Sequence, residues 1–211
     1  MSMVSEKELR SMEKMIDFLE KNVIGKTVYS EETLFDLDFG RYEGAYSTEI
    51  SFSNLLQTET GFTMDGFTVA HENIVETSKP RTLVKDLSSV SFFKYEFSKR
   101  MSSGEITGLL RFVSSSIISN NSPAEATSSS IFDVTIKDDT FKWMEDQVLY
   151  RDQQNNDGSF SAKAFVSENY LKMRDGKLEY GFSAEGYTVD PKTLERKRAF
   201  EYYSPFVAKE K

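Results

Sequence analysis

The chain has 211 residues, 38% of them hydrophobic, and carries a formal net charge of -8 with an isoelectric point near 4.9. This acidic balance disfavours a nucleic-acid partner, because neutralising phosphates requires a basic surface. The absence of cysteine excludes disulfides and cysteine-based zinc sites, and the single histidine, His71, excludes a metal centre with several histidine ligands. A chain of this length is expected to fold as one large domain, residues 1–211, with its own core.

Targeting and catalytic motifs are equally sparse. No apolar segment approaches the roughly 20 residues of a membrane-spanning helix, and the first residues are polar, unlike a secretory signal. The expected compartment is therefore the cytoplasm. No nucleophile elbow, glycine-rich phosphate loop or HExxH metal motif occurs. Enzyme activity stays open, with a non-catalytic role favoured, and the sequence indicates no particular cofactor.

Residues 5–23 are predicted to form an amphipathic helix. Ser5 can cap it, and Glu8 stands three residues later, which completes a capping box. Apolar side chains then recur three or four positions apart on one stripe: Leu9, Met12, Ile16, Leu19 and Val23. Such a helix can plug the mouth of a barrel, pack on its wall, or pair with another chain, for example in a homodimer.

Strands separated by turn residues are predicted from about residue 27 to residue 207. Residues 42–53 alternate apolar with polar side chains, as a strand with one buried face does. Turn signals at residues 65–66, 102–104, 138–139 and 175–176 predict hairpins between strands. The polar loop at residues 119–130 is rejected as a domain boundary, because neither half alone would close a barrel comfortably.

These elements predict an all-β fold. An antiparallel chain of this length must protect its sheet edges, and closing into a barrel removes them. We therefore expect an antiparallel up-and-down β-barrel of about 8–11 strands with one N-terminal amphipathic helix.

His71 is one candidate ligand-binding residue. It shares a strand face with Phe67 and Val69. If this face is the inner one, the imidazole could hydrogen-bond a ligand, act as a general base or bind a haem iron. The alternative is a structural histidine whose hydrogen bonds are satisfied within the protein.

Arg111 is a second candidate. It lies between Leu109 and Val113, and on an inward face it would bind a carboxylate or phosphate group. If the strand faces the other way, the core contains Leu110 and Phe112 and Arg111 is solvated.

Aromatic residues supply the remaining candidates. Tyr46 and Tyr95 could line a cavity with hydroxyl groups. Trp143 follows Phe141 in a row that continues with polar residues at positions 145 and 147. This gradient fits the mouth of a binding cavity, and it also fits a strand that leaves the core.

Carboxylates for acid–base chemistry could come from Glu145, Asp146 or Glu168. Nothing in their spacing distinguishes one from another.

The order of a helix, a glycine, a first strand and consecutive hairpins resembles the lipocalin-like, or calycin, group of barrels. Residues 24–29 (Ile-Gly-Lys-Thr-Val-Tyr) stand where that group has its Gly-x-Trp opening, but without the tryptophan. The cysteines of secreted lipocalins are also absent. The resemblance implies a cup for a small molecule, although the group also includes enzymes.

Three hypotheses of function follow. The leading one is non-catalytic binding of a small hydrophobic or amphipathic molecule in the barrel, oriented by Arg111, His71 or a tyrosine. The second is an isomerase, lyase or cyclase in which His71 or a carboxylate moves a proton. The third is a structural or self-association domain whose barrel is packed solid.

Overall fold

The computed structural model describes residues 10–37, 40–119, 128–154, 160–190 and 192–211. This part of the chain contains helix α2 (Met12–Asn22) and eleven strands. The strands are β1 (Thr27–Tyr29), β2 (Thr33–Leu37), β3 (Tyr42–Gln57), β4 (Gly61–Glu76), β5 (Thr82–Lys99), β6 (Ile106–Ser119), β7 (Ser128–Lys137), β8 (Thr140–Gln154), β9 (Phe160–Arg174), β10 (Lys177–Val189) and β11 (Arg196–Lys209).

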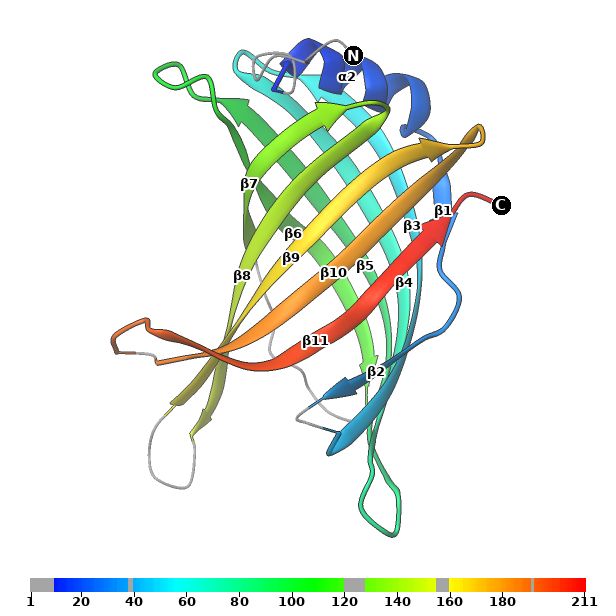
Figure 1. Cartoon of the computed structure of the whole chain (residues 1–211), viewed down its shortest axis with the longest axis vertical. Coiled ribbons are helices and arrows are strands. Elements are labelled where there is room, and N and C mark those ends of the chain that lie inside the picture. Colours follow the sequence, from blue (N-terminus) through cyan, green and yellow to red (C-terminus); the bar gives the residue numbers. More distant parts are fainter. Residues whose placement is uncertain (1–9, 38–39, 120–127, 155–159, 191) are drawn as a thin grey trace.

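The strands form one antiparallel sheet that closes on itself (Figure 1). Strands β3 to β11 pair in sequence order, and the short β1 closes the ring because Tyr29 pairs with Lys209 of β11 and Val28 pairs with Ile50 of β3. Strand β2 pairs with β3 outside this ring, so ten of the eleven described strands make up the barrel. The predicted fold class, an antiparallel barrel with an N-terminal helix, is confirmed.

Helix α2 covers one end of the barrel (Figure 1). Its first described cap is Ser11, whose side-chain oxygen accepts a hydrogen bond from the Lys14 backbone N–H at 3.4 Å. The helix start predicted at Ser5, with Glu8 and Leu9, lies outside the described residues.

The buried face of α2 differs from the predicted stripe. Leu19 and Val23 are buried as expected, but Ile16 is only half-buried. Met15 and Phe18 are buried instead, so the face that meets the barrel is centred on Leu19. The apolar spacing located the helix face correctly to within about one residue step.

The core fills the barrel next to α2. Aromatic rings from neighbouring strands pack face to face or edge to face, as in Phe62–Phe97 at 4.8 Å and Phe97–Phe141 at 5.6 Å between ring centroids. Side chains that point into this part of the barrel are almost completely buried: Phe52, Phe62, Met64, Phe97, Ile106, Ile131, Phe141, Trp143, Leu171 and Leu178.

Three predicted hairpin turns are confirmed. Residues 102–104 join β5 to β6, and residues 138–139 and 175–176 join β7 to β8 and β9 to β10. Asp138, Asp139, Asp175 and Gly176 all have positive φ, as this kind of two-residue turn requires. The predicted loop at residues 119–130 lies mainly in a stretch outside the described residues, between the end of β6 and the start of β7.

The turn predicted at Asp65-Gly66 is wrong. Both residues lie inside the continuous strand β4, and the chain turns earlier, where the Thr58 backbone N–H donates to the Gly61 carbonyl at 2.9 Å. Gly66 is opposite Phe93, and a Cβ at position 66 would lie 2.1 Å from the Phe93 ring. The glycine therefore makes room for an aromatic ring. The Asp-Gly pair, which usually indicates a turn, is explained here by packing inside a strand.

Candidate functional site

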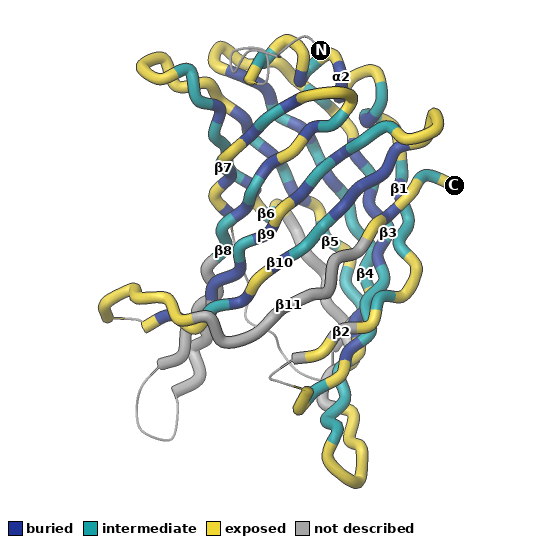
Figure 2. The backbone as a smooth tube through the Cα atoms, in the orientation of Figure 1, coloured by how far each residue is buried: buried dark blue, intermediate teal, exposed yellow. Residues whose placement is uncertain are grey.

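Beyond the core, the inner wall of the barrel combines half-buried residues with buried ones. On β4, Phe62 is completely buried, whereas Thr68 and Ala70, which point to the same side, are half-buried. On β5, Phe97 is 1% exposed, whereas Ser89 on the same face is half-buried. Figure 2 shows buried and intermediate residues alternating along these strands. These inward residues are therefore partly accessible to solvent, and we call the part of the barrel that they line the lower interior.

The end of the barrel opposite α2 carries no helix among the described residues (Figure 1). The lower interior therefore adjoins the aromatic core on the side of α2. A molecule bound in the lower interior would contact the first completely buried side chains at the boundary with the aromatic core.

A cluster of polar side chains lies at that level, which we call the polar cluster: Trp143, Glu145, Ser167, Asn169 and Tyr180. The Tyr180 hydroxyl donates to Asn169 Oδ1 at 2.6 Å, and Asn169 Nδ2 donates to Ser167 Oγ at 3.0 Å. Trp143 Nε1 donates to Glu145 Oε2 at 3.2 Å.

Strand pairing brings the members of the polar cluster together. Trp143 of β8 lies opposite Asn169 of β9, and Glu145 lies opposite Ser167. Strand β10 pairs with β9 on its other side and supplies Tyr180. Because side chains alternate along each strand, these residues all point into the barrel.

Glu145 supplies the carboxyl group of the polar cluster. Its side chain is 7% exposed, and burial raises its pKa from 4.5 to about 7, while hydrogen bonds from Trp143 and Asn169 lower the pKa by a smaller amount. Both donors are neutral, and no Lys or Arg is buried among the side chains that the structure describes. Glu145 can therefore exist as an acid or as a carboxylate near neutral pH.

Three tyrosines face this carboxyl group or one another. Burial, followed by the nearby charge of Glu145, raises the pKa of Tyr95 well above its usual value. Burial also raises the pKa of Tyr180 well above its usual value, and proximity to Tyr95, Glu145 and Tyr46 adds to the effect. Burial raises the pKa of Tyr46 to about 12, partly offset by a hydrogen bond with Thr48. These hydroxyl groups stay neutral at physiological pH and can both donate and accept hydrogen bonds.

Three of the predicted ligand-binding residues lie together inside the barrel. Trp143 and Tyr95 are in contact, with ring centroids 5.8 Å apart, and Trp143 and Tyr180 are 6.3 Å apart. Tyr46 approaches Tyr180 from strand β3. The row that begins at Phe141 runs along the inner wall, so it does not leave the core.

The other two predicted residues lie on the outer surface. His71 is exposed, and its Nδ1 is 2.9 Å from Ser88 Oγ, because the even-numbered residues of β4 are the ones that face the interior. The strand face that carries Phe67, Val69 and His71 is therefore the outer one, not the inner one that a role inside the barrel required. Arg111 is also exposed, 3.5 Å from Glu96, while Leu110 is buried, as the second interpretation of that strand required.

The sequence offered three carboxylates and did not distinguish among them. Asp146 pairs with Arg196 at 2.9 Å and Glu168 with Lys142 at 3.3 Å, both at partly or largely exposed positions. Only Glu145 points into the barrel. In the sequence, Phe141, Trp143 and residue 145 stand in one row of the predicted strand. That shared row was the signal that could have selected Glu145 among the three carboxylates.

Asn169, Ser167 and Tyr180 were not predicted. The sequence did contain a signal for Ser167 and Asn169, because they stand between Phe165 and Leu171 on one face of a predicted strand. Two polar side chains in an apolar row indicate either hydrogen-bond partners across the sheet or a ligand.

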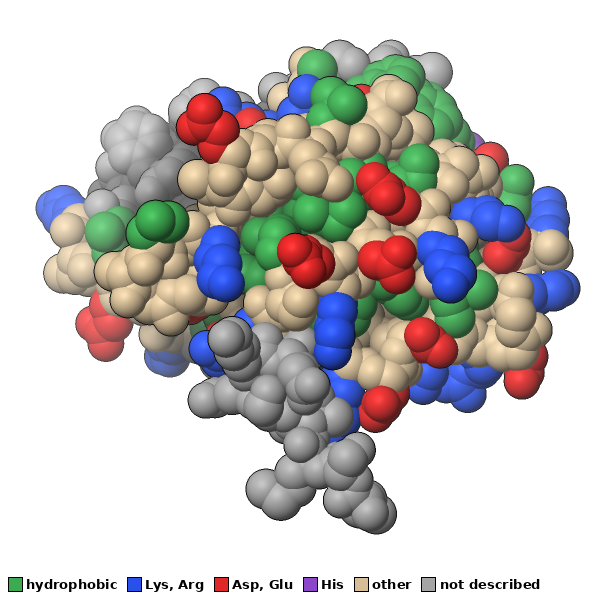
Figure 3. Space-filling model, turned by 90° about the horizontal axis from the view of Figure 1, so that it is seen from above, with side chains coloured by type: hydrophobic (Ala, Val, Ile, Leu, Met, Phe, Trp, Pro, Cys, Tyr) green, Lys and Arg blue, Asp and Glu red, His purple; other side chains and the backbone are tan. Residues whose placement is uncertain are grey.

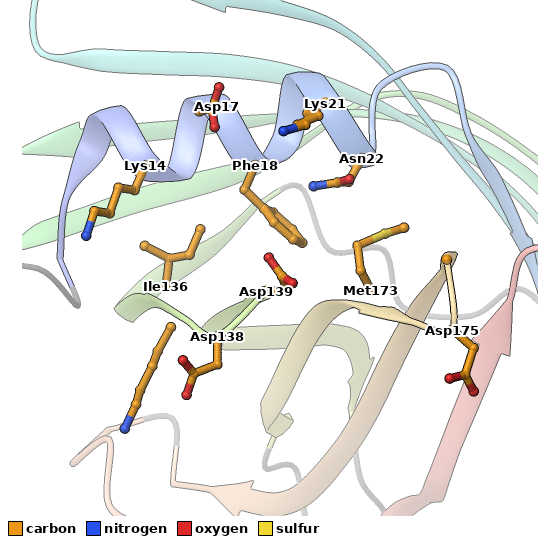
Figure 4. A pocket seen from close by; sticks show the side chains of 12 residues that line it. Lys14, Asp17, Phe18, Lys21, Asn22, Ile136, Asp138, Asp139, Met173 and Asp175 are labelled. Carbon is orange, nitrogen blue, oxygen red and sulfur yellow. The ribbon is translucent and has the colours of Figure 1, made fainter. Parts of the chain in front are cut away.

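A second hollow, a groove of about 670 Å³, lies at the other end of the molecule between α2 and the β7–β8 and β9–β10 turns (Figure 4). Phe18 points from α2 into it, and Asp138, Asp139 and Asp175 come from the turns. Viewed from this end, basic and acidic side chains are interspersed over the surface, with hydrophobic areas between them (Figure 3). Lys14, Lys21 and Lys137 line the groove together with the aspartates, so the groove favours neither charge.

Comparisons of the chain with known protein families, with curated proteins and with solved structures found no match. Within the described residues, no group of three or more His, Cys, Asp or Glu side chains is arranged to hold a metal ion. No helix in the described part of the chain is both long and apolar enough to cross a membrane. The case for a function consequently depends on the barrel interior.

Proposed function

We propose that the protein binds a small amphipathic molecule inside the barrel without changing it. The apolar part of the molecule would occupy the lower interior, and its polar group would contact the polar cluster. The observation that carries this proposal is the placement of a buried, hydrogen-bonding cluster next to an inner wall that is accessible to solvent. Binding sites combine apolar walls with a few placed polar groups in this way.

The energetics of Glu145 support the same proposal. A carboxyl group that is buried with only neutral donors destabilises the fold relative to an apolar side chain of similar size. The neighbouring inward positions Phe141 and Trp143 show that this row accepts apolar residues. A barrel that served only as a solid support would gain stability from an apolar residue at position 145, so a polar residue there favours a ligand.

A second candidate function is proton transfer to or from a bound molecule, as in an isomerase, lyase or cyclase. The pKa of Glu145, which burial raises to about 7, is the observation that favours it, because a general acid or base works best when its pKa is near the working pH. The carboxyl position is held from two sides by Trp143 and Asn169.

Three broader expectations belong to this proposal. We propose that the barrel is a lipocalin-like, calycin-type cup, on the strength of its helix and its order of strands. We propose the cytoplasm as its compartment, because the sequence lacks cysteine. A homodimer remains a proposal as well.

The proposal can be tested with the neutral dye Nile red, whose emission increases in apolar surroundings. Ala70 points into the lower interior, and its neighbour Val69 points outward. We expect Ala70→Phe to lower Nile red binding by about 10-fold or more by filling the space, and Val69→Phe to leave it unchanged. Absence of dye binding, or an equal effect of both variants, would show that the barrel interior is not the site. Native mass spectrometry of protein purified from its source would show whether a molecule is retained.

A further inference from the structure

The charge of the groups around the lower interior limits which ligands fit. Glu145 receives hydrogen bonds from Trp143 and Asn169, and neither donor carries a positive charge. Neither of these two contacts balances the charge of an ionised carboxylate. A ligand that brings a positive charge would stabilise the ionised form of Glu145.

A second carboxyl group lies on the same inner surface. Glu72 belongs to the inward row of β4 and is buried, with 6% of its surface exposed. The charge of Glu72 contributes to the raised pKa of Tyr46, which indicates that Glu72 lies near the Tyr46 hydroxyl. Tyr46 in turn is close to Tyr180. Two acidic residues, Glu72 on β4 and Glu145 on β8, thus belong to inward rows of the barrel.

Aromatic rings add to this preference. Trp143 is within 5.8 Å of Tyr95 and 6.3 Å of Tyr180, measured between ring centroids, beside the carboxyl group that Trp143 binds. The faces of aromatic rings carry partial negative charge and attract cations, tryptophan most strongly. Tyrosine hydroxyls and the Glu145 carboxylate can also accept hydrogen bonds from an ammonium group, which has only donors.

We propose that the ligand carries a protonated amine on an apolar chain, and that its ammonium group pairs with the Glu145 carboxylate at the polar cluster. This inference rests on the proposed function of the barrel as a binding cup and names the chemical class of its ligand. A ligand whose polar end is a carboxylate or a phosphate would be repelled by the like charge of Glu145. A ligand whose polar end is a neutral hydroxyl would bring no positive charge to pair with the Glu145 carboxylate.

Binding should depend on pH in a defined direction. Among the side chains that the structure describes, the titratable groups that face Glu145 are Tyr95 from β5 and Tyr180 from β10, while β9 faces it with Asn169 and β7 with Ile131, which do not ionise. Burial keeps both tyrosines neutral by raising each pKa. Because the pKa of Glu145 is about 7, an amine should bind best above neutral pH and should release a proton when it binds below it.

The test uses octylamine, octanol and octanoate, which share one chain and differ in the polar end. Trp143 is the only tryptophan of the chain and contacts Glu145, so its fluorescence reports on the site itself. Each compound is titrated into the full chain at about pH 8 and about pH 5, in the wild type, in Glu145→Gln and in Glu168→Gln. Glu168 is a matched control, because it is a glutamate that points outward and pairs with Lys142.

At about pH 8 we expect octylamine to bind most tightly and octanoate most weakly. Octylamine affinity should fall about 10-fold or more in Glu145→Gln and at about pH 5, the usual size of effect for a hydrogen bond to a charged group, and should be unchanged in Glu168→Gln. Octanol affinity should stay within about 3-fold across all of these conditions.

Equal or tighter binding of octanol or octanoate, or octylamine binding that Glu145→Gln leaves intact, would overturn the amine assignment. The same holds if none of the three binds while Nile red still does, and in each of these cases the cup itself stands. Failure of all three compounds together with failure of Nile red would remove both the amine assignment and the proposed function.

Discussion

Glu145→Gln should change how the stability of the protein depends on pH. Glutamine keeps the shape of the side chain and its ability to accept a hydrogen bond from Trp143, but it cannot ionise. In the wild type the pKa of Glu145 rises from 4.5 in the unfolded chain to about 7 in the fold, because burial disfavours the charged form.

The sign follows from proton counts. Between the two pKa values the folded protein holds a proton on Glu145 that the unfolded chain has lost, so raising the pH lowers the free energy of unfolding. This contribution is fully present below pH 4.5 and is lost as the pH rises through about 7. Since one pKa unit corresponds to about 1.4 kcal/mol, the loss amounts to roughly 3 kcal/mol across that range.

Urea unfolding at a series of pH values between about 4 and about 9 measures this directly. Relative to the wild type, Glu145→Gln should gain roughly 3 kcal/mol of stability as the pH rises over the interval. Glu168→Gln, an exposed control, should change stability by less than about 1 kcal/mol throughout. If the free energy of unfolding depends on pH in the same way in the wild type and in Glu145→Gln, the conclusion that Glu145 is a buried carboxyl group without a cationic partner is refuted. A wild type that becomes more stable relative to the variant at high pH would reveal a cationic partner.

Two further changes test the packing that supports the site. Leu19→Ala removes a completely buried side chain of α2 and should lower the free energy of unfolding by about 2–5 kcal/mol in urea titrations. The control Glu20→Ala changes an exposed neighbour and should have little effect. A Leu19→Ala protein of unchanged stability would mean that α2 does not seal the barrel. Gly66→Ala places a Cβ 2.1 Å from the Phe93 ring and should cost about 1–3 kcal/mol, with part of the loss recovered when Phe93→Leu is added. No recovery in the double variant would mean that the two residues do not compete for the same space.

The sequence by itself determined the fold class. Alternation of apolar and polar residues is a local property of a strand, and the turns at Asp138-Asp139 and Asp175-Gly176 follow from backbone conformations that those residues readily adopt. Local signals were therefore sufficient for the kind of elements, although not for every strand boundary, as the turn predicted at Asp65-Gly66 shows. The helix needed only the spacing of its apolar side chains, although that spacing placed the centre of the buried face at Ile16 and not at Leu19.

Which face of each strand points inward was decided by the tertiary structure. On β4 both faces carry apolar residues, with Phe67 on one and Phe62 on the other, so alternation alone could not assign His71. The structure settles it because Phe62 packs on Phe97 in the core. The signal at Asp65-Gly66 was ambiguous for a similar reason, since a glycine serves a turn and a close approach by a ring equally well.

The polar cluster also depends on the tertiary structure. Glu145, Asn169 and Tyr180 belong to three different strands, and only the pairing of β8 with β9 and of β9 with β10 brings them within hydrogen-bond reach. The sequence identified Trp143 and the polar row that follows it, because those residues share one strand. The row shared with Trp143 could have favoured Glu145 over Asp146, but the burial that separates an inward carboxyl from its solvated neighbour exists only after the barrel has closed.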